Sequence, residues 1–210
     1  VIVFAMGAVL LYRMPDLQLP VIVLALVFWG AALLVLRFHG LGFNPFASKV
    51  ALALTGLVCG WAGWMAITLI QALPSGHWWI LYVFGIAWGA DIGAYFTGKQ
   101  FGKTKLAPTI SPGKTWEGVL GGLALAGIGC GSVVYVWQED GWLWVLITLV
   151  LIGLSVCGDL FESFVKRQMG VKDSGALLPG HGGVLDRIDS ILIVLPILAT
   201  LLLKFGLGSL

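Results

Sequence analysis

Residues 158–189 read GDLFESFVKRQMGVKDSGALLPGHGGVLDRID and are the most charged stretch of the chain. Hydrophobic residues make up 59% of the 210 residues, charged residues only 10%, and the mean hydropathy is +1.00. In soluble domains about a quarter of the residues are charged. The composition therefore predicts an integral membrane protein, with the charged stretch as its candidate functional site. The stretch holds five of the ten acidic and four of the twelve basic residues, namely Asp159, Glu162, Asp173, Asp186 and Asp189 with Lys166, Arg167, Lys172 and Arg187.

Six apolar runs are long enough to cross a bilayer, which requires about 20 residues. They are Leu19 to Leu36, Val50 to Leu73, Trp78 to Thr97, Trp116 to Trp137, Trp142 to Gly158 and Ile188 to Leu207. Val1 to Tyr12 is too short to span, at about 1.5 Å per residue, and we interpret it as the remnant of a helix, with earlier helices missing from this chain. We expect an all-α, multi-pass transmembrane helix bundle, a single domain over residues 1–210 with no separate soluble domain.

The basic residues are distributed unevenly over alternate loops. Cytoplasmic loops carry the excess of Lys and Arg, so loops 98–115 and 159–187 are predicted to face the cytoplasm from the inner (cytoplasmic) membrane. The net charge of +2 is too small, and the basic residues too scattered, for a nucleic-acid groove. Only Arg13 and Lys204 fall on the opposite side, against Arg37, Lys49, Lys99, Lys103, Lys105, Lys114, Lys166, Arg167, Lys172 and Arg187.

Several glycines recur every four residues, a spacing that lets transmembrane helices approach closely. We interpret this spacing as packing within one bundle and leave a homodimer open as the alternative. The pairs and triplets are Gly56/Gly60, Gly85/Gly89/Gly93, Gly118/Gly122 and Gly127/Gly131.

One polar stripe follows the fifth apolar run. Asp159, Glu162, Ser163 and Lys166 are spaced i, i+3, i+4 and i+7, so they share one face of a predicted short amphipathic helix at the membrane surface. The alternative for such residues is a solvated loop or a helix cap. Asp159 borders an apolar span, where an unpaired carboxylate is costly, and this favours a functional role.

A second acidic pair begins the last run. Asp186 and Asp189 are i, i+3 neighbours where the start of a helix favours negative charge. Carboxylates from two helices, with cationic side chains nearby, suit Mg²⁺, which prefers one or two carboxylates plus substrate phosphates. Between them, the glycine loop Pro179 to Gly183 has backbone N–H groups that suit a phosphate. For His181 a structural turn is the alternative.

The other cytoplasmic loop, TGKQFGKTKLAPTISPGKTWE over residues 97–117, is predicted to be basic and irregular and to suit a triphosphate. Juxtamembrane lysines also set topology or attract anionic headgroups, and this alternative fits Lys99 and Lys105 better than Lys114. The spacing is not that of a Walker A loop. Asp91 lies within a span, where a carboxylate indicates function, and we expect it to line the same cavity.

The run from Ser163 to Asp189, S-x2-KR-x4-KD-x-G-x2-LP-x-HGG-x2-DR-x-D, resembles the complete signature of the phosphatidate cytidylyltransferases, or CDP-diacylglycerol synthases. Gly89 to Tyr95 and Ser111 to Gly118 also resemble that family, so the likeness is close over residues 85–210. One departure is Ile92, where the family usually has Thr or Ser. If that hydroxyl helps to bind a cation or a phosphate in the family, this chain must do without it or use Thr97.

The resemblance implies a nucleotidyltransferase that makes CDP-diacylglycerol and pyrophosphate from CTP and phosphatidic acid with Mg²⁺, a second cation being left open. The lipid phosphate would attack the α-phosphorus of CTP. Two alternatives remain: a CTP-dependent membrane lipid kinase, and a transporter, whose ionisable groups would lie near the bilayer midplane.

The family pattern assigns roles residue by residue. The catalytic residues it implies are Asp159, Lys166 and Asp186. The metal ligands it implies are first Asp159 and Asp186, with Glu162 and Asp189 in support; Asp91, from its place within a span, is a further candidate. The substrate-binding residues it implies are Ser111, Lys114, Ser163, Arg167, Lys172, Asp173, His181, Gly182, Gly183 and Arg187.

Overall fold

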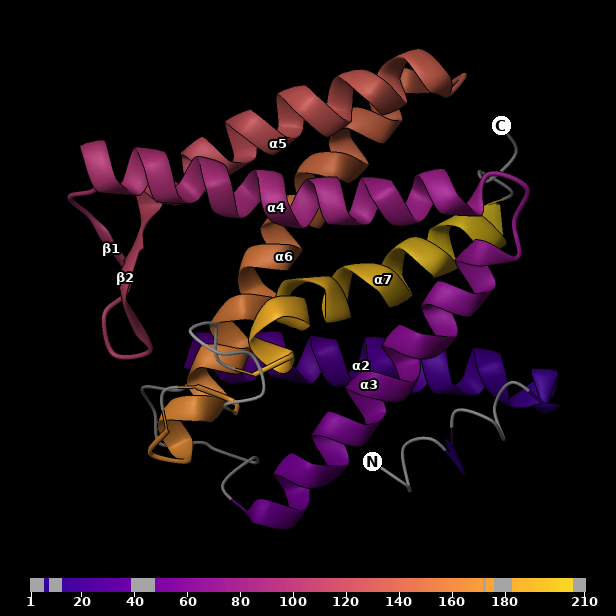
Figure 1. The fold of residues 1–210 in the computed structure, drawn as a ribbon, viewed down its shortest axis with the longest axis horizontal. Coiled ribbons are helices and arrows are strands. Elements are labelled where there is room, and N and C mark those ends of the chain that lie inside the picture. Colours follow the sequence, from indigo (N-terminus) through magenta and orange to yellow (C-terminus); the bar gives the residue numbers. More distant parts are fainter. Residues whose placement is uncertain (1–5, 8–12, 39–47, 172, 176–182, 206–210) are drawn as a thin grey trace. The chain divides into compact units, whose positions relative to one another are not determined.

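The structure, a computed structural model, describes residues 6–7, 13–38, 48–171, 173–175 and 183–205 and is mostly helical there (Figure 1). The helices α2 to α6 are each long and apolar enough to cross a membrane, which confirms a multi-pass membrane protein. The elements in order are η1 (Pro15–Leu17), α2 (Gln18–Phe38), α3 (Lys49–Gln71), α4 (Gly76–Phe101), β1 (Lys105–Ala107), β2 (Ser111–Thr115), α5 (Trp116–Trp137), α6 (Gly141–Gln168) and α7 (Leu185–Phe205).

Both ends of the predicted topology reach beyond the described residues. The last predicted span, Ile188 to Leu207, coincides with α7 as far as Phe205, and its role as a sixth span stays a prediction. The helix remnant predicted over Val1 to Tyr12 lies outside the described residues, except for Met6 and Gly7.

The chain divides into two compact units, Val1–His77 with Leu192–Ser209, and Trp78–Ile191. In the first unit α2 packs against α3. The α2 residues Ile22, Ala25, Trp29 and Ala32 recur every three or four positions and are almost fully buried, which is the pattern of one packed helix face. The single domain expected over residues 1–210 stays a prediction. Every described candidate site residue lies in the second unit.

In the second unit α4 and α5 lie side by side (Figure 1), and glycines set their separation. A Cβ atom on Gly89 would lie 3.0 Å from the Cβ of Ala126, and one on Gly93 would lie 2.8 Å from the Cα of Gly122. Because the glycines have no side chain, the two backbones approach closely. The glycine spacing predicted to pack helices within the bundle is confirmed for α4.

Helix α6 packs against α5 and is also joined to α4. The indole rings of Trp79 and Trp144 lie 4.7 Å apart between centroids. The buried Tyr82 hydroxyl lies 2.7 Å from Thr148 Oγ1, which itself donates to the Trp144 carbonyl oxygen. These contacts fix the rotation of α6 about its axis and therefore the direction of the residues that follow on it.

Replacing Tyr82 with Phe removes one buried interhelical hydrogen bond and leaves the ring contacts intact. We expect the free energy of unfolding to fall by about 1 kcal/mol, since such bonds within membranes are worth about 0.6 to 1.7 kcal/mol. Thermal unfolding in detergent measures the change. The control is Tyr135→Phe, because Tyr135 is exposed, and an equal loss of stability in both variants would contradict the role of the Tyr82–Thr148 bond.

The short amphipathic helix predicted at the membrane surface after Gly158 is not a separate element. Helix α6 continues without a break from Gly141 to Gln168. Phe161 and Phe164 are buried, and Glu162 is only 7% exposed. The prediction of a separate helix was wrong because α6 continues through Gly158 and Asp159, and because the protein buries Glu162 and half-buries the rest of the polar stripe.

The basic loop between α4 and α5, predicted to be irregular, contains an antiparallel hairpin of β1 and β2. Lys105 pairs with Thr115, and the Thr104 N–H donates to Glu117 Oε1 at 3.0 Å. Thr115 then caps α5 by accepting a hydrogen bond from the Gly118 N–H at 3.1 Å. The hairpin therefore fixes Lys114, one residue before the cap, at the start of α5.

Candidate functional site

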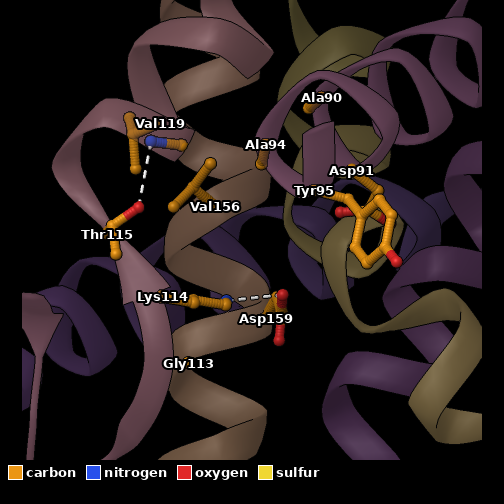
Figure 2. A pocket seen from close by; sticks show the side chains of 11 residues that line it. Ala90, Asp91, Ala94, Tyr95, Gly113, Lys114, Thr115, Val119, Val156 and Asp159 are labelled. Carbon is orange, nitrogen blue, oxygen red and sulfur yellow. Dashed lines mark hydrogen bonds and ion pairs between the residues drawn. The ribbon is translucent and has the colours of Figure 1, made fainter. Parts of the chain in front are cut away.

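A pocket of about 240 Å³ lies where α4, β2, α5 and α6 meet (Figure 2). Its polar lining includes Asp91 and Tyr95 from α4, Lys114 and Thr115 from β2, and Asp159 from α6. Asp91, Lys114 and Asp159 were each predicted from the sequence as site residues, and all three line this one pocket.

Lys114 and Asp159 form an ion pair across the pocket (Figure 2), with Lys114 Nζ 2.5 Å from Asp159 Oδ2. The side chains are 22% and 29% exposed, so both remain reachable from the pocket. The pair joins the strand before α5 to the C-terminal half of α6. It places one positive and one negative group beside the same cavity, as a site for charged substrates requires.

Three carboxylates converge beside this pocket. One carboxylate oxygen from each of Asp159, Glu162 and Asp189 lies within 4.8 Å of the others. Glu162 and Asp189 are 7% and 9% exposed. Asp159 and Glu162 are one turn apart on α6, and Asp189 comes from the start of α7, so two helices build the cluster.

This donor set fits a divalent cation. Carboxylate oxygens are the ligands that Mg²⁺ and Ca²⁺ prefer, and like charges this close need a cation to neutralise them. Both Glu162 Oε atoms are buried. Lys166 Nζ lies 2.6 Å from Glu162 Oε2, an electrostatic contact that neutralises one of the three charges.

Asp186 is not one of these three carboxylates, but it contacts Glu162 and accepts several hydrogen bonds. Its Oδ1 accepts a hydrogen bond from Lys166 Nζ at 2.8 Å, and its Oδ2 accepts from the backbone N–H groups of Gly183 at 2.7 Å and Ser174 at 3.0 Å. Burial opposes ionisation of the carboxyl, but the bond from Lys166 and the other hydrogen bonds outweigh it and hold the pKa of Asp186 below its usual range.

The remaining predicted residues are spread around these groups. Arg167 turns to the hairpin, where its Nε donates to the Ile110 carbonyl oxygen at 3.3 Å. Ser111 and Ser163 are half-buried, while Asp173 and Arg187 are exposed. Lys172, His181 and Gly182 lie outside the described residues.

Thr97, the alternative to the hydroxyl absent at Ile92, bonds within its own helix. Its Oγ1 donates to the Gly93 carbonyl oxygen at 2.5 Å, within its own helix. Its side chain also fills the space beside Gly121. Thr97 is not among the residues that line the pocket.

Sequence reasoning missed several residues that shape the site. Tyr95 lies one turn after Asp91, and this i, i+4 spacing was a signal for a shared wall. Thr115 was identifiable as a helix cap from its place directly before Trp116. Val156 lies one turn before Asp159 on α6, so its i, i+3 spacing was a signal of the same kind. The Ser174 N–H carried no local signal, because only the folded chain brings it to Asp186.

The sequence profile of the cytidylyltransferase family matches residues 1–205, so the chain belongs to this family and is a membrane-embedded nucleotidyltransferase. The family and the acidic cluster together indicate a divalent cation. Membership in this family favours an enzyme over the transporter alternative.

Three relatives carry one name. The chain is 43% identical over 204 residues to the phosphatidate cytidylyltransferase of Pseudomonas aeruginosa, covering 96% of this chain and 75% of the relative. It is 47% identical over 129 residues to the Haemophilus influenzae enzyme of that name, 58% of this chain and 44% of the relative. A Staphylococcus aureus enzyme is 48% identical over 136 residues, 64% of this chain and 52% of the relative. The chain thus spans between about half and three quarters of their lengths.

Proposed function

We propose that this chain is a phosphatidate cytidylyltransferase, which converts CTP and phosphatidic acid into CDP-diacylglycerol and pyrophosphate for phospholipid synthesis. One observation carries the proposal: Lys114 and Lys166 lie directly against a carboxylate cluster beside a pocket formed by bilayer-spanning helices. A phosphate-transferring enzyme with a lipid substrate needs a cation site, cationic side chains and access to the membrane in one place. The names of the relatives support the same activity.

The cation proposed here is Mg²⁺, held by Asp159, Glu162 and Asp189. Asp186 remains the further ligand that the family pattern implies, and Asp91 is a candidate in the pocket lining. When bound, it would neutralise the charge of the phosphates during transfer. A second cation remains part of the proposal.

The chain's own groups provide positioning and charge. The lipid phosphate is already an anion, so its attack on the α-phosphorus of CTP needs no strong general base. A bond forms between a lipid phosphate oxygen and the α-phosphorus, the bond from the α-phosphorus to the bridging oxygen breaks, and pyrophosphate leaves with that electron pair. Lys114 and Lys166 stabilise the negative charge that develops.

The other signature residues complete the proposal. They would bind substrate phosphates or shape the site around them, and the exposure of Arg187 and Asp173 leaves both accessible to a ligand. We assign this role to Ser111, Ser163, Arg167, Lys172, Asp173, His181, Gly182, Gly183 and Arg187.

We place the protein in the inner membrane with the pocket facing the cytoplasm. Ten of the twelve Lys and Arg residues lie on the predicted cytoplasmic side. The hairpin that holds Lys114 lies in loop 98–115, which is predicted to face the cytoplasm. A homodimer stays a prediction.

The direct test is a product analysis. Purified chain in detergent, given labelled CTP, phosphatidic acid and Mg²⁺, should form CDP-diacylglycerol and pyrophosphate in equal amounts, and a chelator should stop the reaction. The kinase alternative predicts CDP and a lipid phosphate from diacylglycerol instead. The absence of CDP-diacylglycerol in the complete mixture would overturn the proposal.

Replacing Lys114 with Met should lower kcat/KM for CTP by about 10² to 10³, the usual effect of removing one charge-stabilising group. The matched control is Lys105→Met in β1, since Lys105 is exposed and pairs along the hairpin. Steady-state kinetics measure both variants. Equal activity of the Lys114 and Lys105 variants would remove Lys114 from the substrate site.

A further inference from the structure

Lys166 and Arg167 are adjacent basic residues near the end of α6, and they serve different sides of the helix. Lys166 Nζ lies 2.6 Å from Glu162 Oε2, beside the acidic cluster. Arg167 is rotated from it by about 100° around the helix axis, and its Nε donates to the Ile110 carbonyl oxygen in the turn of the hairpin at 3.3 Å. We infer that Arg167 is a positioning residue, which holds the hairpin on α6 and thereby sets the position of Lys114. This inference rests on the proposed function and assigns a role within the same site.

The hairpin is joined to α6 at both ends of its second strand. At the turn the Ile110 carbonyl oxygen bonds to Arg167, and at the other end Lys114 Nζ lies 2.5 Å from Asp159 Oδ2 (Figure 2). The strand from Ile110 to Lys114 extends about 13 Å at about 3.3 Å per residue. The helix from Asp159 to Arg167 extends about 12 Å at about 1.5 Å per residue. The two lengths agree, so strand and helix can lie alongside each other in opposite directions with one contact at each end.

The hairpin is closed at both ends, so a restraint on its turn reaches Lys114. The Ile110 N–H donates to the Ala107 carbonyl oxygen at 3.2 Å and closes the turn. The Trp116 N–H donates to the Thr104 carbonyl oxygen at 2.9 Å and closes the open end. The Ile110 side chain is only 4% exposed, so the turn is also held by burial. A shift of the turn therefore moves the strand as a unit, and Lys114 moves with it.

Lys114 depends on its backbone for its position. Its side chain is 22% exposed, and a partly exposed ion pair restrains a long side chain only weakly. The backbone of β2 therefore has to keep the ammonium group at the pocket, and the bond from Arg167 restrains that backbone. Arg167 is not one of the described residues that line the pocket. Because a misplacement of about 1 Å can lower a rate by about 10²-fold, Arg167 can still affect turnover through Lys114.

Direct contact with a substrate phosphate is the competing role for Arg167. The residue is exposed, and its guanidinium has further N–H groups besides the one that reaches Ile110. The two roles require different properties of the side chain. A phosphate is bound by the positive charge, whereas the Ile110 carbonyl oxygen requires only an N–H donor at the right distance. Variants that separate the charge from the donor therefore decide between the two roles.

Arg167→Gln removes the charge but keeps a donor, because the Gln Nε2 follows Cδ as the Arg Nε does. Arg167→Met has a similar length and no donor. The positioning role predicts that Arg167→Gln keeps kcat within about threefold of the unchanged protein, while Arg167→Met lowers it by about 10 to 100-fold because Lys114 is misplaced. The control is Gln168→Met, which changes the neighbouring exposed residue on α6 and should leave kcat unchanged. Steady-state formation of CDP-diacylglycerol measures all three variants.

Two further measurements identify the positioning role. Amide hydrogen exchange at Ile110 and Trp116, whose N–H groups close the two ends of the hairpin, should become about fivefold faster or more in Arg167→Met and stay unchanged in Arg167→Gln. The effects of Arg167→Met and Lys114→Met on kcat should be non-additive, because Arg167 acts through Lys114. Two residues that bind substrate independently would give additive effects.

The outcomes are distinct. If Arg167→Gln loses as much kcat as Arg167→Met, the charge is what matters, Arg167 binds a substrate phosphate directly, and the inference is overturned. Unchanged amide exchange in Arg167→Met would overturn it as well, because the hairpin would then not depend on the bond to Ile110. If the unchanged protein makes no CDP-diacylglycerol, the proposed function fails, but amide exchange still decides whether Arg167 holds the hairpin on α6.

Discussion

Replacing Asp159 with Asn is expected to lower turnover by about 10³ or more, since the change removes a charge from the cation cluster and from the pocket at once. Asp159 is the one residue shared by the two: it pairs with Lys114 in the pocket and contributes an oxygen to the cluster with Glu162 and Asp189. Asn is nearly isosteric, so the helix should be unaffected. CDP-diacylglycerol formation and Mn²⁺ binding should fall together.

Asp140→Asn is the matched control for this prediction. Asp140 is the residue before α6, and its side chain makes no capping hydrogen bond. The two variants should elute identically in gel filtration, so a difference in activity cannot come from folding. A near-normal rate in Asp159→Asn would refute the assignment of the cluster.

Replacing Gly93 with Leu is expected to have the largest effect on stability. A Cβ atom there would lie 2.5 Å from the Gly121 carbonyl oxygen and 2.8 Å from the Gly122 Cα atom. Both atoms are backbone, so the clash cannot be relieved by turning a side chain and must separate α4 from α5. We expect a loss of about 3 kcal/mol or more in the free energy of unfolding, at or above the usual range for overpacking.

The control for the packing prediction is Gly153→Leu in α6. A Cβ atom on Gly153 meets nothing within 4 Å, so the same substitution in a neighbouring helix should be tolerated. Thermal denaturation in detergent, followed by the loss of monodisperse protein, compares the two. If both variants melt at the temperature of the unchanged protein, α4 and α5 do not depend on close backbone contact.

The helical spans could be predicted from the sequence because each is a local property. Twenty apolar residues in a row identify a membrane helix without reference to any other part of the chain, and five of the predicted runs coincide with α2 to α6. The predicted end of the fifth span at Gly158 was wrong because it too rested only on local hydropathy. Charge in the sequence indicated an end to the apolar run, but a helix can continue through polar residues when its surroundings satisfy them.

The hairpin was missed because its two strands are short and polar. Glycine, proline and lysine predominate around it, and no alternation of apolar residues indicates a strand in Ser111–Thr115. What holds the hairpin in place is non-local: the Thr104 N–H bonds to Glu117, and Arg167 reaches its turn from α6.

The sequence indicated which residues are candidates for the site, but not which of them lie next to one another. Spacing alone placed Asp159, Glu162 and Lys166 on one face of a helix. The sequence could not show which of Asp186 and Asp189 meets that face, because this depends on how α7 begins relative to α6. In the structure Asp189 joins the carboxylates and Asp186 joins the lysine.

Because α6 has no break, the number of residues between Trp144 and Asp159 fixes both the distance and the rotation between these two side chains. Trp144 packs against Trp79 near the N-terminal end of α6. Asp159 follows 15 residues later, which is about 22 Å along the helix axis at 1.5 Å per residue. One residue inserted between them would advance Asp159 by about 1.5 Å and rotate it by about 100°. The carboxylates would then leave the pocket although every one of them was still present. The stretch between Trp144 and Asp159 should therefore tolerate exchanges of apolar side chains but no change in the number of residues.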